Sequence, residues 1–190
     1  IWWFYLFWIP GWLSTVRGGG LDVKSFGLPL AFFYTMTTVG SIGGGWVSGY
    51  LIKKGMSPFK ARRITMLVFA LLVVPIIFAQ SKGVSTWGAV CLIALAASAH
   101  QAWSANIFTT VSDAFPKKAV SSITGIGGAA GAIMGAFISK IAGLILQHFK
   151  DLGHIETGYV VMFSIAGSAY LVAWIIMFVF RPKNPKVELD

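Results

Sequence analysis

The sequence predicts an all-α, polytopic membrane protein. Of its 190 residues, 56% are hydrophobic and 11% are charged, whereas an ordinary soluble domain carries roughly 25% charged residues. Mean hydropathy is +0.77. Apolar runs recur along the whole chain, and the longer ones reach about 20 residues, the length that spans a bilayer as a helix. No sizeable stretch is left for a soluble domain.

Six apolar runs predict six transmembrane helices. They cover residues 1–14, 28–52, 64–80, 87–110, 121–147 and 158–180. We expect residues 1–180 to form one six-helix bundle and residues 181–190 to form a basic tail. The chain opens on an apolar run without a start Met, so we expect it to be a piece of a longer protein.

The basic residues are placed as membrane topology requires. The net charge is +9, but Lys and Arg sit in short clusters between the apolar runs, and we therefore do not expect nucleic-acid binding. Alternate linkers and the tail hold ten of these residues, against four on the other side. By the positive-inside rule the ten lie in the cytoplasm. We expect a multi-pass protein of the inner cell membrane with a cytoplasmic C-terminal tail.

Acidic residues are absent from the predicted spans. All six carboxylates fall in linkers, at span ends or in the tail. Proton relays in transporters usually use intramembrane Asp, Glu or His, so the absence of carboxylates limits the proton chemistry that this chain supplies by itself. No metal-ligand spacing accompanies His100, and we expect neither a metal nor an organic cofactor.

The first two spans carry candidate cavity residues. Pro10 removes a backbone donor in the first span, and we expect the helix to break there. Tyr5 and Trp8 lie one turn apart before this point and share a face. In the second span, Tyr34 and Thr38 belong to a polar stripe that faces either protein or a water-filled cavity.

The stretch "SAHQAWSANIF" places polar side chains inside the fourth span. Helical projection puts His100, Trp103 and Asn106 on one face, with Gln101 at its edge. These side chains either form interhelical hydrogen bonds or line a polar cavity near mid-membrane. Amides suit hydroxyl and carboxylate oxygens, and an indole suits the apolar face of a sugar ring. The combination predicts a site for a small polyhydroxylated solute.

A glycine ladder runs along the fifth span. Its small residues recur every fourth position and include Gly127, Gly131, Gly135 and Gly143. Such a ladder lets a neighbouring backbone approach closely, so we expect a helix-packing face.

Several longer motifs carry a family resemblance. They are "FYLFWIPGWL", "GGGWVSGYLIKKG" with "ARR", "SAHQAWSANIFTTVSDAFPKKAVSSITGIGG" and "RPK". With these, the chain resembles the C-terminal six-helix half of a major facilitator superfamily transporter, and within it the anion:cation symporter family and its hexuronate transporters.

The resemblance implies a twelve-helix carrier that works by alternating access, with the N-terminal half of the same transporter as partner. It implies uptake of a sugar acid together with protons as the coupling ion. It also implies that eight residues contact the substrate: Tyr5, Trp8, Tyr34, Thr38, His100, Gln101, Trp103 and Asn106.

The inner loops of the family carry gating charges, which the resemblance places at Asp113, Arg62 and Arg63. We expect Asp113 to cap the following turn, with a gating ion pair as the alternative. The family's acidic residue at the inner end of the second span is replaced here by Gly49.

Two other function classes remain open at this point. One is a membrane-embedded enzyme that uses His100, and the other is a structural membrane subunit that transports nothing. A symporter is the function we expect, with the proton-carrying carboxylates in the other half, and we do not expect an enzyme.

Overall fold

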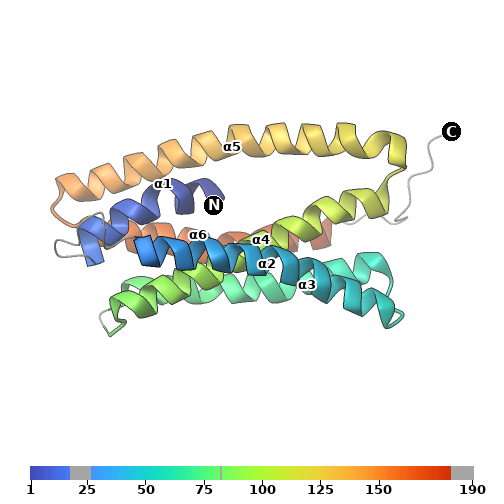
Figure 1. Ribbon diagram of the computed structural model, residues 1–190. Coiled ribbons are helices and arrows are strands. Elements are labelled where there is room, and N and C mark those ends of the chain that lie inside the picture. Colours follow the sequence, from blue (N-terminus) through green and yellow to red (C-terminus); the bar gives the residue numbers. More distant parts are fainter. Residues whose placement is uncertain (18–26, 82, 181–190) are drawn as a thin grey trace.

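The computed structural model describes residues 1–17, 27–81 and 83–180, and every regular element in these ranges is helical (Figure 1). The helices are α1 Trp2–Trp12, α2 Gly27–Lys53, α3 Pro58–Val73, α4 Thr86–Ala114, α5 Lys117–Asp151 and α6 Ile155–Val179. A π-helical turn, η1 (Leu13–Arg17), follows α1, and a 3₁₀-helix, η3 (Val74–Gln80), follows α3. The predicted all-α membrane class is confirmed. The predicted tail, residues 181–190, lies outside the described residues.

Length and hydropathy single out the membrane-spanning helices. Among the described residues, four helical segments are long and apolar enough to cross a membrane: Pro58–Gln80, Thr86–Ala114, Lys117–Asp151 and Ile155–Val179. Helix α2 has 27 residues but is rich in glycine and hydroxyl side chains, and α1 has 11 residues. The count of six spans therefore stays a prediction.

The predicted break at Pro10 is wrong. Helix α1 continues through Pro10 to Trp12 and then passes directly into η1. The hydroxyls of Ser14 and Thr15 both donate to the carbonyl oxygen of Gly11, at 2.9 and 2.7 Å. The helix type therefore changes from α to π one turn after Pro10.

Helix α3 begins earlier than the apolar run predicts. It starts at Pro58. Proline suits the first helical turn, because a backbone N–H at that position would have no partner within the helix. Arg62 and Arg63 therefore lie in the first two turns of a helix, and not in a loop. The helical backbone therefore fixes the positions from which the Arg62 and Arg63 side chains extend.

Helix α4 is the centre of the bundle and packs against α2, α3 and η3. In Figure 1, α5 runs along the side of the bundle away from α2 and α3, with α1 beside it. The α2–α4 crossing is very close, because a Cβ added at Gly40 would overlap the backbone of Ser98, and one at Gly44 would overlap Ala102. Small residues on both helices thus set this spacing.

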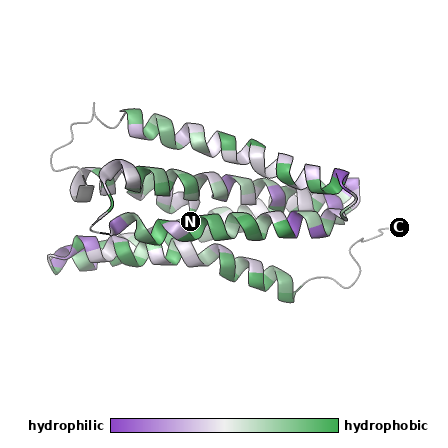
Figure 2. Ribbon diagram, turned by 90° about the horizontal axis from the view of Figure 1, so that it is seen from below, coloured by the Kyte–Doolittle hydropathy of each residue, from purple (hydrophilic) through white to green (hydrophobic). Residues whose placement is uncertain are grey.

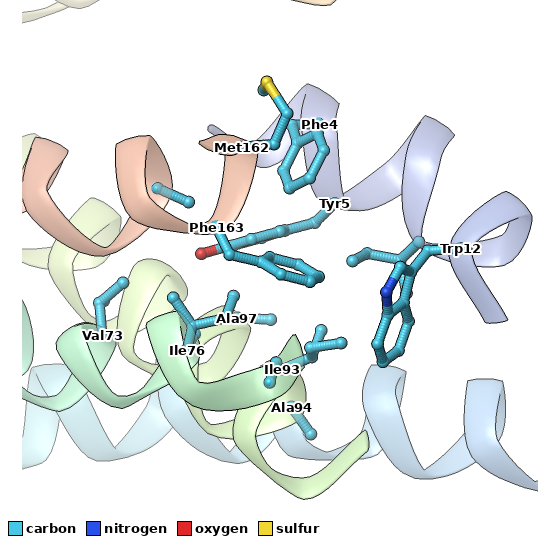
Figure 3. Packing of buried hydrophobic residues seen from close by; sticks show 14 of the residues in the cluster. Phe4, Tyr5, Trp12, Val73, Ile76, Ile93, Ala94, Ala97, Met162 and Phe163 are labelled. Carbon is cyan, nitrogen blue, oxygen red and sulfur yellow. The ribbon is translucent and has the colours of Figure 1, made fainter. Parts of the chain in front are cut away.

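An aromatic cluster fixes α1 to α6 (Figure 3). The ring of Phe163 meets Phe4 and Trp12 edge-on, with centroids 5.9 and 5.5 Å apart. Ile76 and Ile93 lie beneath the same cluster and are fully buried. Apolar residues dominate the length of the helices, and the more polar ones gather toward the ends of the bundle (Figure 2). That distribution suits a protein surrounded by lipid.

Candidate functional site

A cavity opens between α1, α4 and α5 around His100. Its volume is about 260 Å³. It is lined by Ile1, Trp2, Trp3, His100, Gly131, Met134, Gly135 and Ile138. His100 is the one ionisable side chain in this lining, and two indoles form part of its wall. The cavity therefore combines an aromatic surface with a group that can donate or accept a hydrogen bond.

Two neighbours fix the His100 ring. Its Nδ1 lies 2.5 Å from the hydroxyl oxygen of Tyr170 on α6. Its face stacks on Trp2, with centroids 5.3 Å apart and an interplanar angle of 13°. Because Tyr170 occupies Nδ1, Nε2 is the ring nitrogen left for a ligand.

Trp103 supports this pair and does not line the cavity. It is buried and meets Tyr170 edge-on, with centroids 5.5 Å apart. Its Nε1 has no hydrogen-bond partner within the described part of the chain. In this structure α6 covers the ring through Tyr170, and substrate contact by Trp103 stays a prediction.

Asn106 is a packing residue and is fully buried. Its Nδ2 donates to the carbonyl oxygens of Gly44 on α2 (3.0 Å) and Ala102 on α4 (2.8 Å). The structure contains the interhelical hydrogen bond that the sequence left open as the alternative, and substrate contact by Asn106 stays a prediction. The close α2–α4 crossing leaves no space beside the amide.

The candidates on α1, Tyr5 and Trp8, are not among the residues that line the His100 cavity. Tyr5 is buried within the aromatic core, and its place on the cavity side stays a prediction. Trp8 lines a different cavity of about 360 Å³ between α1, α5 and α6, together with Gly143, Lys150 and Tyr159. The two side chains thus do not share one function, although they lie one turn apart.

Tyr34, Thr38 and Gln101 remain accessible. Tyr34 is 47% exposed, and the exposed Thr38 donates its hydroxyl to the Tyr34 carbonyl oxygen at 3.2 Å. Gln101 is half-buried beside His100 in sequence. No described element of this chain encloses the three in one pocket, so their substrate contact stays a prediction.

The predicted gating residues form a network at the basic end of the bundle. Arg62 Nε lies 3.1 Å from Asp113 Oδ2, and Arg62 Nη1 donates to Ser48 Oγ at 2.5 Å. The expected cap is absent, since α5 begins after Pro116 without a side-chain cap. Asp113 instead ties α4 to α3, and Ser48 adds α2. Arg63 lies apart from this ion pair, over the ring of Phe178.

Only part of the glycine ladder packs within this chain. Gly135 and Gly143 lie against the indoles of Trp3 and Trp8, so side chains of α1, and not a helix backbone, fill these positions. Gly127 and Gly131 have no atom within 4 Å of an added Cβ in the described structure. The packing role of Gly127 and Gly131 therefore stays a prediction.

Two residues of the site were absent from the sequence prediction. Trp2 belongs to a dense aromatic run, and nothing in the run distinguishes it from its neighbours. Tyr170 is a hydroxyl side chain within the apolar sixth span, which was the available signal. Pairing it with His100 required the fold, because 70 residues separate them.

The fold and the site define a multi-pass, all-helical membrane protein. No protein-family model matches the chain. It is 28% identical over 145 residues to the "Probable L-galactonate transporter" of Escherichia coli strain K12, covering 76% of this chain and 32% of that protein. It is 25% identical over 147 residues to the "D-galactonate transporter" of Escherichia coli O6:H1 strain CFT073, covering 77% and 33% respectively.

The chain thus spans about a third of the length of the curated relatives it matches. Both relatives are named as transporters and not as enzymes, in agreement with the expectation that this chain is no enzyme. The similarity links the chain to proteins named for sugar acids.

Proposed function

We propose that the chain is the C-terminal six-helix half of a sugar-acid transporter of the major facilitator superfamily, which works by alternating access with an N-terminal half as partner. The similarity to two galactonate transporters, each matched over only a third of its length, supports both the substrate class and the half-transporter assignment. We place the protein in the inner cell membrane with its tail in the cytoplasm.

The substrate site on this half is the cavity around His100. Its indole walls suit the C–H face of an extended polyol, and a free imidazole nitrogen suits a hydroxyl group. This cavity is the single observation that carries the site assignment. Galactonate is an aldonate, so we propose aldonates ahead of the hexuronates that the sequence resemblance favours.

The substrate carboxylate needs a positive partner that this half does not supply. Lys140, the one Lys or Arg within a predicted span, is exposed and does not line the His100 cavity. We assign the anion-binding residue and the proton-carrying carboxylates to the N-terminal half. The coupling ion in this proposal is the proton.

The ion pair of Arg62 and Asp113 holds the inner ends of α3 and α4 together. A partly buried, charge-assisted hydrogen bond of this kind is stronger than one between neutral groups. We propose that it rigidifies the inner end of this half while the two halves rock.

Uptake by the complete protein in proteoliposomes tests the function. We expect labelled D- or L-galactonate to accumulate when the outside is acidic and to stop when the proton gradient is collapsed. Equal uptake with and without the gradient would remove proton coupling but keep transport. Failure to take up or bind any aldonate or hexuronate would overturn the proposed function.

A further inference from the structure

A third cavity lies at the basic end of the bundle, and it shares no lining residue with the His100 cavity. Its volume is about 580 Å³, and it opens between the start of α3 and the end of α6. Three cationic residues contribute to its lining: Lys60, Arg62 and Arg63. The transport proposal makes no use of this cavity.

Two of these cations lack a carboxylate partner. Arg62 is paired with Asp113. Lys60 is exposed, and neither it nor Arg63 forms an ion pair with any acidic residue that the structure describes. The rim of the cavity therefore has positive charge that an anion can neutralise.

The walls behind the rim are apolar. Phe59 and Met66 come from α3, and Ile176, Met177 and Phe180 come from α6. Ile176 and Phe180 are 52% and 79% exposed, so an accessible apolar surface lies beside the cationic residues. Charge at the rim and hydrocarbon in the wall match a molecule with an anionic head and an acyl chain.

The Arg63 side chain is held in place at this rim. Its guanidinium carbon lies 5.0 Å from the ring centroid of Phe178. The backbone at Arg63 is also tied to α6, because its carbonyl oxygen accepts a hydrogen bond from Trp174 Nε1 at 2.9 Å. A cation fixed over an aromatic ring loses less entropy when it binds a phosphate.

We propose that this cavity binds an anionic phospholipid, with its phosphate at Lys60 and Arg63 and an acyl chain along α3 and α6. Basic pockets between transmembrane helices on the cytoplasmic side are known to hold such headgroups. This proposal does not depend on the transported solute, because the cavity lies between α3 and α6 and its occupancy is measured by lipid binding.

Native mass spectrometry of the complete protein in detergent tests the proposal. We expect phosphatidylglycerol to bind more tightly than phosphatidylcholine with the same acyl chains. Lys60→Gln with Arg63→Gln should reduce the phosphatidylglycerol affinity by about 10- to 30-fold, since each basic residue near a surface contributes ~1 kcal/mol.

A matched control removes the same charge outside the cavity. Lys53→Gln with Lys54→Gln changes the same end of the bundle, and neither residue lines the cavity. We expect this variant to keep the wild-type affinity within twofold. Equal losses in the two double variants would mean general surface attraction and would overturn the site.

Three further outcomes are decisive. Lys60→Glu changes an exposed side chain and leaves the Arg63 contacts intact, so a folded variant with unchanged preference for phosphatidylglycerol overturns the proposal. If millimolar inorganic phosphate displaces bound phosphatidylglycerol as well as added lipid does, the cavity is a site for free anions, and the lipid proposal is overturned. Binding that appears only after deletion of residues 181–190 would identify the tail as the occupant, whereas unchanged binding supports the lipid.

Discussion

The hydroxyl oxygen of Tyr170 lies 2.5 Å from Nδ1 of His100, across the interface between α6 and α4. This pair fixes the orientation of the imidazole that lines the candidate substrate cavity. The sequence marks His100 as a polar side chain in an apolar span, whereas it predicts no role for Tyr170.

Tyr170→Phe should weaken galactonate uptake by about tenfold while the protein stays folded. The ring and its contact with Trp103 are kept, and only the hydroxyl that positions His100 is lost. Loss of one such hydrogen bond costs about 1 kcal/mol of stability. Uptake kinetics and a thermal unfolding curve in detergent measure the two effects. Tyr159→Phe is the control, because Tyr159 lies on the same helix but lines the cavity beside Trp8, and this variant should leave uptake unchanged.

Asn106→Ala should lower stability in the first place. The amide bridges Gly44 and Ala102, and interhelical hydrogen bonds in membranes contribute about 0.6–2 kcal/mol. We expect a lower unfolding temperature and reduced expression, with Ser104→Ala as a half-exposed control on the same helix. A stable Asn106→Ala protein that has lost uptake would return Asn106 to the substrate site.

Gly44→Ala should destabilise the bundle where Gly43→Ala does not. An added methyl at Gly44 overlaps Ala102, whereas nothing lies within 4 Å of one at Gly43. Overpacking of this kind costs about 1–3 kcal/mol. Unfolding temperatures of the two purified variants compare the α2–α4 crossing with an open face of the same helix. Equal temperatures would contradict the close crossing.

Arg62→Gln and Asp113→Asn should each destabilise the basic end of the bundle. The Arg62 and Asp113 side chains are 14% and 25% exposed, so each leaves the other charge partly buried and unpaired. Hydrogen bonds to charged groups contribute about 1.5–3 kcal/mol. The exchanged pair, Arg62→Asp with Asp113→Arg, should recover part of the loss in a thermal unfolding assay. Additive losses in the exchanged pair would show that the two residues act separately.

The sequence predicted the helices better than it predicted the site. Apolar run length located α4 and α6 closely, because a membrane span needs about 20 apolar residues wherever it lies. The start of α3 was missed, since the charged residues from Lys60 to Arg63 hide a helical turn that Pro58 opens.

Helical projection identified the polar face of α4 but not its neighbours. His100, Trp103 and Asn106 share that face, yet α1 and α5 border the first, α6 covers the second and α2 covers the third. One polar stripe is therefore divided among several contacts. No property of α4 alone specifies which helix lies over each turn.

Binding of a sugar acid in the cavity around His100 can be measured by titration of galactonate into the complete protein. Isothermal titration calorimetry of the wild type, His100→Ala and the control Ser104→Ala gives the three affinities. We expect His100→Ala to bind at least about tenfold more weakly, about 1.4 kcal/mol, while Ser104→Ala stays within twofold of the wild type. Wild-type affinity in a folded His100→Ala protein would contradict the assignment of this cavity.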